Sequence, residues 1–565
     1  MFHIKIKATF LFSLFIIMNL SAQYNTLWIP DTISGTTFNL TLRDTFTQLK
    51  TGNQTITAGI NHNIWGPTLF FNKGDIVHLN VKNNLNDSTT LHWHGMHLPA
   101  VMDGGPHQII PPGTLWQPFW KVSNNAATYW YHPHLHEMTQ EQMTKGLGGF
   151  IIVRDAEEKA LALPRTYGVD DIPIALTSRR YTTNNAFVTS KSSYGDEMLV
   201  NGTPKPEVSL PKQLVRIRIL NAEMERSYNL GFSDGRTYYI IANDGGLLNA
   251  PVAATKTLLA VGERIEILVD LSNDAVGATL DLNAYNGGFP LGFPGGEPGK
   301  TGEFGSLLNN TTFNVLHIKI AATTSNPIKT VPTSLVNNKY WTESDATFSR
   351  TIKVTNGNPG GAPFDLDNAP FSFTKINHTV PLNNIEKWTI TNNGVFGHAF
   401  HIHDVEFKLV SRSNGAVGVH ESGWKDVLYL PVNTSATFVA KFDDYADAIH
   451  PFMYHCHFAP HEDGGMMGQF VVTDPTNFSQ IDNYSTKFTV FPNPATNRVY
   501  VNFEDSNASA YYIKIVNALG KTMMMLPKPD LQNGIDISNL SSGIYFMQLM
   551  DNKYKKESTQ KFIVK

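Results

Sequence analysis

The chain has 565 residues, and at roughly 100–200 residues per domain this length predicts several domains. Charged residues make up only 16% of the chain and the net charge is -4, so the sequence lacks the basic excess of nucleic-acid binders. Glycine (43 residues) and proline (31 residues) are frequent, which together with the low charge favours β-rich modules over helical bundles.

The first 23 residues are predicted to be a signal peptide. Lys5 and Lys7 give a basic start, residues 8–20 are almost wholly apolar, and Ser21 and Ala22 supply small residues for cleavage. The apolar run is too short to span a bilayer comfortably, and no later run approaches about 18 apolar residues. We therefore expect a mature protein without a membrane span, exported through the periplasm to the cell surface or the medium.

Most of the remaining chain consists of short runs in which apolar and polar residues alternate, such as 75–81 and 264–270, separated by turn-forming residues. This period of two is typical of half-buried β-strands, and no long segment shows the helical period. The pattern predicts an all-β chain of three sandwich-sized domains and a smaller fourth. The predicted boundaries are 24–160, 161–325 and 326–475 for the three domains, 476–487 for a linker, and 488–565 for the C-terminal domain.

Histidines form alternating pairs in the first and third of these domains, whereas the second domain has no such pair. Template counting predicts about one His-x-His pair by chance. The sequence has five, formed by His92/His94, His132/His134, His134/His136, His401/His403 and His455/His457. Since residues i and i+2 of a strand share a face, each pair projects two imidazoles side by side. So many imidazoles exceed the four ligands that one zinc ion prefers and favour a cluster of several metals.

The single cysteine, Cys456, lies between His455 and His457, so strand alternation turns its thiol to the face opposite the two imidazoles. One strand can thus serve a sulfur site on one face and an imidazole site on the other. His461 and Met466 follow closely, and His398 opens a second histidine motif. A His-Cys-His set with a weak axial Met is typical of blue-copper electron-transfer sites.

Residues 24–474 resemble the multicopper oxidases. The matching segments are His92-Trp93-His94-Gly95, Trp130-Tyr131-His132-Pro133-His134, His398-Ala399-Phe400-His401-Ile402-His403, and His455-Cys456-His457 through Met466. All four segments stand in the order the family has them. Three further segments are similar to cuprous oxidases and bilirubin-oxidase-like enzymes: Asp103-Gly104-Gly105-Pro106, Gly423-Trp424-Lys425-Asp426 and His461-Glu462-Asp463.

The resemblance implies three cupredoxin-like Greek-key β-sandwich domains and four copper ions. It implies a type 1 copper held by His398, Cys456, His461 and Met466, a type 2 copper held by His92 and His401, and a type 3 pair held by His94, His132, His134, His403, His455 and His457. The second domain would be a spacer without copper. Electrons from a reducing substrate, taken up at an exposed edge of His461 or His398, would reduce O2 to water, and Asp103 and Glu462 would relay protons.

Several residues depart from the family pattern or stand beside it. Ala399 replaces the usual Pro and Asp404 the usual Gly, which leaves the rigidity of that loop open. We expect His136 to be a bystander rather than a ligand. Met467 adjoins Met466, and the spacing from Cys456 favours Met466 as the axial residue.

The last block resembles the C-terminal sorting domain of the type IX secretion system. It begins Phe491-Pro492-Asn493-Pro494, contains Gly543-Ile544-Tyr545, and ends Lys561-Phe562-Ile563-Val564-Lys565. The resemblance implies a small β-sandwich that the secretion machinery recognises, so we expect that machinery to be a partner. The alternative is an ordinary accessory β-domain.

The sequence says least about the electron donor. The chain has 16 methionines, but none lies between Met224 and Met453, and residues 287–305 are rich in Gly and Pro. Copper-tolerance oxidases often carry a methionine-rich insert over the type 1 site, because thioethers bind Cu(I). We therefore favour oxidation of phenols or similar organic donors, as in laccases, with cuprous oxidase or bilirubin-oxidase-like activity as alternatives. A copper nitrite reductase would lack the eight cluster histidines, and a non-enzymatic relative would have lost ligands.

Overall fold

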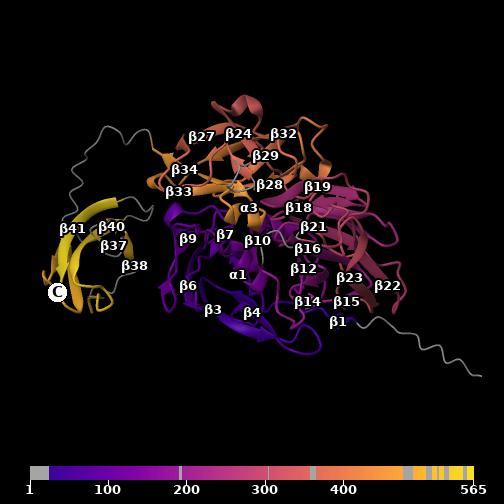
Figure 1. Cartoon of the computed structure of the whole chain (residues 1–565), viewed down its shortest axis with the longest axis horizontal. Coiled ribbons are helices and arrows are strands. Elements are labelled where there is room, and N and C mark those ends of the chain that lie inside the picture. The colour runs from indigo at the N-terminus through magenta and orange to yellow at the C-terminus, as the bar shows by residue number, and fades with distance from the viewer. Residues whose placement is uncertain are drawn as a thin grey trace, which may run out of the picture.

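The computed structural model describes residues 24–189, 194–302, 304–356, 364–474, 488–503, 512–517, 521–526, 533–550 and 556–565. The predicted signal peptide and the predicted linker 476–487 lie outside the described residues. These described residues form eight sheets, so the all-β prediction is confirmed. Figure 1 shows three sandwiches gathered around a common centre, with the C-terminal block set to one side.

The first sandwich packs two sheets around a core that contains Phe38, Leu79, Trp93 and Tyr131. One sheet has the order β2 (Thr32–Ser34), β5 (Thr68–Asn72), β11 (Gly149–Arg154), β10 (Thr128–His132) and β7 (His92–His94); the other has β4 (Thr55–Ile60), β3 (Thr37–Thr47), β6 (Ile76–Asn84) and β8 (Leu115–Trp116), with β9 (Phe119–Lys121) also on β6. Strand β7, which carries one histidine pair, lies at the edge of its sheet.

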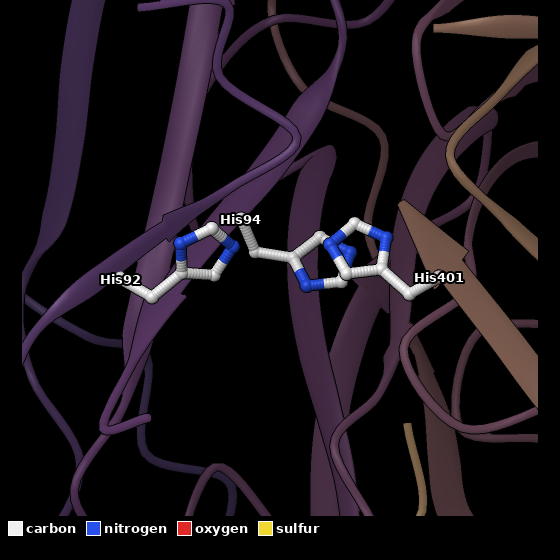
Figure 2. Close-up of side chains that lie close together, drawn as sticks. All are labelled: His92, His94 and His401. Atoms are coloured by element: carbon white, nitrogen blue, oxygen red, sulfur yellow. The ribbon is translucent and has the colours of Figure 1, made fainter. Parts of the chain in front are cut away.

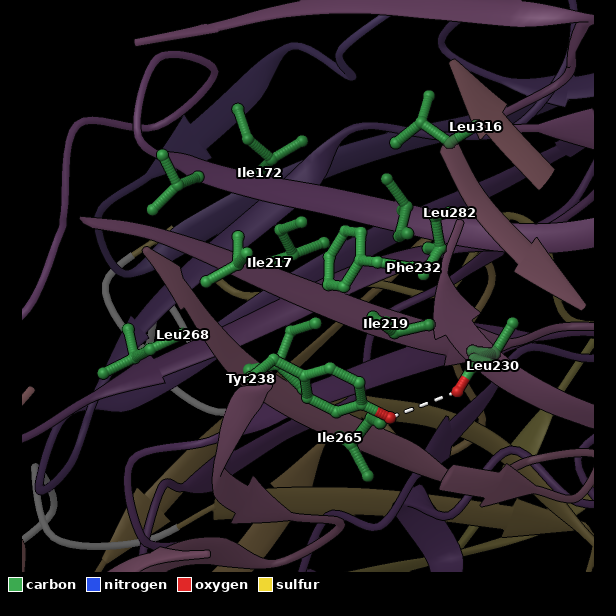
Figure 3. Packing of buried hydrophobic residues seen from close by; sticks show 14 of the residues in the cluster. Ile172, Ile217, Ile219, Leu230, Phe232, Tyr238, Ile265, Leu268, Leu282 and Leu316 are labelled. Atoms are coloured by element: carbon green, nitrogen blue, oxygen red, sulfur yellow. Dashed lines mark hydrogen bonds between the residues drawn. The ribbon is translucent and has the colours of Figure 1, made fainter. Parts of the chain in front are cut away.

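The second sandwich has the largest core, in which aliphatic strands enclose Phe232 and Tyr238 (Figure 3). The Tyr238 hydroxyl donates a 3.1 Å hydrogen bond to the carbonyl oxygen of Leu230, which satisfies a buried polar group. One of its sheets has the order β14 (Thr203–Pro204), β13 (Glu197–Val200), β12 (Asp171–Arg179), β16 (Leu214–Asn221), β21 (Arg264–Asp270), β18 (Tyr238–Asn243) and β19 (Gly246–Ala254). The other has the order β1 (Asn25–Thr26), β15 (Pro206–Pro211), β23 (Thr312–Ala321), β22 (Thr279–Tyr285), β17 (Tyr228–Phe232) and β20 (Thr257–Leu259). Strand β1 therefore joins the second sandwich, although the predicted boundary assigns it to the first domain.

The third sandwich repeats the plan of the first. One of its sheets has the order β25 (Phe364–Leu366), β24 (Phe348–Asn356), β27 (Asn384–Asn392), β32 (Thr434–Phe442), β29 (Phe407–Arg412) and β30 (Trp424–Lys425). The other has the order β26 (His378–Pro381), β34 (Met467–Thr473), β33 (Asp447–Cys456), β28 (His398–Ile402) and β31 (Val427–Leu430). Strands β28 and β33 carry the third and fourth histidine motifs as neighbours. Trp388 is fully buried at the centre of the core.

The C-terminal block is a small sandwich of two antiparallel sheets. One sheet contains β35 (Phe488–Phe491), β36 (Arg498–Phe503) and β39 (Ile535–Asp536), and the other contains β38 (Thr522–Leu526), β37 (Tyr512–Asn517), β40 (Gly543–Met550) and β41 (Lys556–Val564). The block has its own core, which includes Phe488, Ile513, Met547 and Phe562. It therefore buries apolar surface independently of the three larger sandwiches.

Helices are few and short in the described residues. They are α1 (Thr139–Lys145), α2 (Ala156–Ala160) and α3 (Ala459–Asp463), with the 3-10 turns η1 (Ala100–Met102), η2 (Glu343–Asp345) and η3 (Val419–Glu421). None of the helices in these ranges combines the length and apolar character that crossing a bilayer requires. Helices α1 and α3 meet across the first and third sandwiches, where Asp463 accepts hydrogen bonds from the backbone N–H groups of Thr139 (3.0 Å) and Gln140 (2.9 Å).

The three large sandwiches share a common core cluster. It contains Trp130 of the first sandwich, Leu220 of the second and Ala459 of the third, all buried. The ring of Trp130 lies 5.2 Å from that of His94, 4.1 Å from that of His132 and 5.5 Å from that of His457, so the sandwiches are packed against one another where these predicted ligands lie.

Candidate metal centre

Strand register brings the histidines of each sandwich face to face. On the antiparallel pair β7 and β10, His92 is opposite His132, and on β28 and β33, His401 is opposite His455. Directly opposed residues of an antiparallel pair project on the same face. Phe400 is opposite Cys456 on the next position, so the thiol points to the other face of the sheet, as the alternation predicts.

The predicted cluster ligands are brought together between the first and third sandwiches. All eight imidazoles are buried, with at most 2% of each residue exposed. They form sets whose ligand atoms lie within 4.8 Å of one another: His94, His132 and His457; His134, His403 and His455; and His92, His94 and His401. In each set the members come from both sandwiches.

The ring nitrogens of two sets converge. Nδ1 of His94 lies 3.1 Å from Nε2 of His457 and 3.4 Å from Nε2 of His132. Nε2 of His455 lies 3.2 Å from Nε2 of both His134 and His403. Three imidazole nitrogens about 2 Å from one metal lie roughly 3.3 Å apart, so both triangles have the dimensions of a metal site.

A third position lies between His92 and His401. Each ring donates Nδ1–H to a backbone carbonyl oxygen, that of Asp103 at 2.9 Å for His92 and that of Asp426 at 2.8 Å for His401. The Nε2 atom of both rings is buried without a hydrogen-bond partner. Figure 2 shows His92 and His94 reaching from one strand and His401 from the other side, with the last two rings overlapping. A buried orphan nitrogen is costly unless a metal satisfies it.

The thiol set lies on the opposite face of β33. The Cys456 sulfur is 3.5 Å from Nδ1 of His398 and 3.5 Å from Nδ1 of His461. Met466 is buried in the same hydrophobic core as Cys456, and its backbone N–H donates a hydrogen bond to the carbonyl oxygen of His461. Imidazole and thiolate ligands in this combination suit copper.

Burial and the close packing of like groups favour the neutral form of most of these imidazoles. Desolvation and the neighbouring histidines lower the pKa of seven of them well below the ordinary value: His94, His132, His134, His398, His401, His403 and His457. Burial lowers the pKa of His455 and of His461 to about 3. The neutral ring is the form that binds a metal. Burial raises the pKa of the Cys456 thiol, so its ionisation requires a nearby positive charge such as a metal ion.

The two predicted relay carboxylates lie beside the cluster. Asp103 Oδ2 is 2.8 Å from Nδ1 of His403, and Glu462 Oε1 is 3.1 Å from Nδ1 of His134. Both carboxyl groups are buried. Burial, with the neighbouring Asp463 charge, raises the pKa of Glu462 well above its ordinary value. The Thr139 hydroxyl of α1 donates a 2.7 Å hydrogen bond to Glu462.

The expectation that an edge of His398 or His461 is exposed is wrong. His398 is fully buried and His461 is 4% exposed. The ring of Phe364 lies 4.7 Å from that of His398 and 4.6 Å from that of His461, and Phe396 lies near both. Phe364 stands 34 residues before His398 in the sequence, which is why the motif alone did not reveal its part of the cover, whereas Phe396 stands only two residues before that ligand.

Asp404, which stands where the family usually has Gly, adopts φ +70°. Asp tolerates this left-handed region better than most residues, so the loop keeps its shape. Its carboxylate lies 2.8 Å from Nδ1 of His97, which neighbours the first histidine motif.

His136 packs against the rings of Phe371 and Phe373.

Sequence reasoning missed how Asp426 serves the site. Asp426 was noted only as part of the segment Gly423–Asp426, with no role assigned. Its carboxylate lies 3.2 Å from Nε2 of His94 and accepts two hydrogen bonds from Arg264 of the second sandwich. The segment itself was a visible signal, but its partner lies 162 residues away, and no local pattern links the two.

The fold and the donor set define a copper protein built from cupredoxin-type sandwiches, and comparison with known proteins agrees. Profiles described as multicopper oxidase match residues 42–158 and 342–476, and a secretion system C-terminal sorting domain matches residues 489–565. The chain is 31% identical to the multicopper oxidase mco of Staphylococcus haemolyticus over 76% of this chain and 86% of that protein. It is 33% identical to the cell division protein FtsP of Proteus mirabilis, over 74% and 85%.

Solved structures give the same result. A bacterial laccase-like multicopper oxidase, CueO, from Ochrobactrum sp. superposes with a TM-score of 0.70 at 29% identity, covering 79% of this chain and all of that one. McoA from Aquifex aeolicus superposes with a TM-score of 0.72 at 25% identity, covering 80% and all of that chain. The chain belongs to the multicopper oxidase family and is therefore a copper-dependent oxidoreductase that uses O2. Its last block is a sorting domain, which indicates export or a surface location.

Proposed function

We propose that the protein is a laccase-like oxidase with four copper ions in the two sites described above. The type 1 ion is assigned to His398, Cys456, His461 and Met466, the type 2 ion to His92 and His401, and the type 3 pair to the two imidazole triangles. The observation that carries the proposal is the convergence of eight buried imidazoles beside a strand that also bears the thiol.

Copper, when bound, supplies one-electron oxidation of the donor at the thiol site and reduction of O2 at the imidazole cluster. The chain itself links the two sites covalently and delivers protons to the cluster. Cys456 is bonded directly to His455 and His457, one from each imidazole triangle. This covalent link is the shortest route in the chain between the thiol site and the cluster.

Asp103 and Glu462 are proposed to deliver protons to the reduction site. Each contacts the Nδ1 atom of one imidazole of the same triangle, His403 or His134. Their carboxyl groups are buried, so protons held there reach the cluster without passing through bulk water. The raised pKa of Glu462 favours the protonated carboxyl group, which is the form that donates.

An organic donor fits the surroundings of the thiol site better than Cu(I) does. Phe364 and Phe396 cover the two histidines, and neither ring offers a soft ligand. The Gly/Pro-rich loop packs beside them, since its Gly292 carbonyl oxygen accepts a hydrogen bond from the backbone N–H of Gly397. The neighbouring loop residue Leu291 is 78% exposed. An aromatic donor can pack on such apolar surfaces.

The relatives named as cell division proteins raise a second possibility, a structural role without catalysis. The buried ligand sets speak against it, because a structural protein has no need of orphaned imidazole nitrogens in a dry core. The experiment is oxygen uptake by the copper-loaded protein with a methoxyphenol and, separately, with Cu(I). We expect uptake with the phenol. Uptake with Cu(I) alone would assign the protein to cuprous oxidation, and no uptake with either would overturn the proposal.

A further inference from the structure

Arg264, the first residue of β21, reaches from the second sandwich to the rear of the histidine cluster. Its side chain is fully buried, and all five of its N–H groups donate. Nη1 and Nη2 each donate a 2.6 Å hydrogen bond to one oxygen of Asp426. The remaining three bond the carbonyl oxygens of Thr128, Gly262 and Asp244 at 2.9–3.1 Å. A fork of this kind fixes the carboxylate plane, not only its position.

Asp426 in turn fixes two of the imidazoles. Its carboxylate oxygen Oδ1 lies 3.2 Å from Nε2 of His94, and its backbone carbonyl oxygen accepts from Nδ1 of His401. Gly95, at φ +81°, makes room for this contact, since a Cβ there would lie 2.5 Å from Oδ2 of Asp426 and 2.9 Å from Nη2 of Arg264. The glycine of the first histidine motif is thus required by the close approach of this ion pair.

His94 is oriented differently from the cluster imidazoles whose Nδ1 atoms bond the protein. His92, His132, His401 and His455 donate Nδ1–H to backbone carbonyl oxygens, and His403 bonds Asp103 through Nδ1. His94 instead turns Nε2 toward Asp426 and presents Nδ1 to His132 and His457. An acceptor at Nε2 selects the tautomer with a free Nδ1. The orientation of His94 therefore depends on where the Asp426 carboxylate is held.

We propose that Arg264 is a positioning residue for the imidazole cluster: its two-point contact with Asp426 holds His94 with Nδ1 toward the metal. The second sandwich, which the sequence predicted to be only a spacer, then forms part of the cluster's support. A Cβ at Gly262, two residues before Arg264, would lie 3.0 Å from the ring of His457, so the same turn of this sandwich closely approaches two members of one triangle. The inference rests on the proposed four-copper assignment.

A neighbouring group of buried arginines provides the control. Arg216 on β16 contacts Glu158 at 2.8 Å and Glu266 at 2.9 Å, and ties the second sandwich to the first. It is as deeply buried as Arg264 and lies on the adjacent strand, but the residues that it bonds are not predicted ligands or partners of them. Arg216→Lys therefore shows the effect of losing the two-point hydrogen bonding of a buried arginine at this interface when no predicted metal ligand is involved.

The experiment compares Arg264→Lys and Arg216→Lys in the full-length, copper-loaded protein. Lysine keeps the charge but cannot bond both carboxylate oxygens in a fixed plane. For Arg264→Lys we expect the blue absorption of the thiol site to persist, whereas the near-ultraviolet absorption of the type 3 pair and the copper content fall. Oxygen reduction should slow at least about tenfold, the usual effect of losing an outer-shell partner. For Arg216→Lys we expect a lower melting temperature with unchanged copper content and spectra.

A second variant shows whether Arg264 acts through Asp426. Asp426→Asn should reproduce the spectral loss of Arg264→Lys, and the double variant should be no worse than either single one. If Arg264→Lys fails to fold, as loss of the blue band would show, Asp426→Asn decides the question alone. Unchanged near-ultraviolet absorption in the variants that fold, or equal loss in Arg216→Lys, would overturn the inference. Wild-type protein that binds four copper ions but takes up no oxygen would instead contradict the proposed function.

Discussion

The thiol set and the imidazole cluster differ in how many parts of the chain build them. His398, Cys456 and His461 all belong to the third sandwich and its helix α3. The cluster takes histidines from two sandwiches, and Arg264 of the remaining one pairs with Asp426 beside it. The thiol set can therefore form within one folded sandwich, whereas the cluster requires all three sandwiches to be packed together. Damage at the interfaces should remove the cluster first, and damage within β33 should affect both.

The largest effect is expected for Cys456→Ser. The hydroxyl does not replace the thiolate as a copper ligand, so the blue colour should vanish and donor-driven oxygen uptake should fall more than about 1000-fold. The imidazole cluster lies on the other face of the strand, so its copper and its near-ultraviolet absorption should remain. Quantitative copper analysis with visible spectra measures both. Retained blue colour would remove Cys456 from the site.

A smaller effect is expected from the two carboxylates. Asp103→Asn and Glu462→Gln should each slow reoxidation by O2 by about 100-fold, the usual size of a lost proton-transfer group. Reduction of the thiol site by donor should be unchanged, as stopped-flow bleaching and recovery of the blue band would show. The matched control is Asp170→Asn, which alters a buried carboxylate that accepts a hydrogen bond from the backbone N–H of Thr166, away from the cluster. Equal turnover in all three variants and the wild type would rule out the relay.

The interface between the first and third sandwiches should respond to pH through Glu406. Burial raises its pKa to about 7, and its carboxylate accepts hydrogen bonds from Tyr129 (3.1 Å) and Asn124 (3.3 Å). Between pH 4.5 and 7 the folded chain keeps a proton that the unfolded chain has lost, so stability falls as pH rises. The loss is at most about 3 kcal/mol.

Glu406→Gln should remove that pH dependence, because the amide resembles the protonated acid. Melting temperatures of the variant and the wild type should match at pH 5, and the variant should melt higher at pH 8. The thiol set is internal to the third sandwich, so its blue band should not change with this substitution. A variant that melts lower than the wild type at pH 8 would show that the ionised carboxylate stabilises the interface.

The smallest effect concerns the aromatic cover of the thiol set. Phe364→Ala should open the approach to His398 and His461 and lower KM for a bulky phenol a few-fold, with little change for a small one. The control is Phe364→Leu, which keeps the cover apolar. Phe438→Ala is not a suitable control, because that ring lies in the core of the third sandwich and its removal opens no approach to the two histidines. If the KM values of both donors in Phe364→Ala equal those of the wild type, donors enter elsewhere.

The sequence predicted the fold class and the convergence of the histidines because both depend on short-range alternation. His92 and His94, or His455 and Cys456, reveal their faces from spacing alone. The aromatic cover by Phe364 and the role of Arg264 could not be predicted in this way. Both depend on how separate strands are packed, and no residue spacing encodes a contact between segments 34 or 162 residues apart. Strand β1 joined the second sandwich for the same reason.

The most direct test of the central claim is electron stoichiometry measured on protein of known copper content. With four copper ions per chain and a blue band, oxidation of a one-electron phenolic donor should consume one O2 for every four donor molecules, and no hydrogen peroxide should accumulate. That result requires the thiol site and the imidazole cluster to work together. One O2 for every two donor molecules, with peroxide as the product, would contradict a cluster that completes the reduction to water.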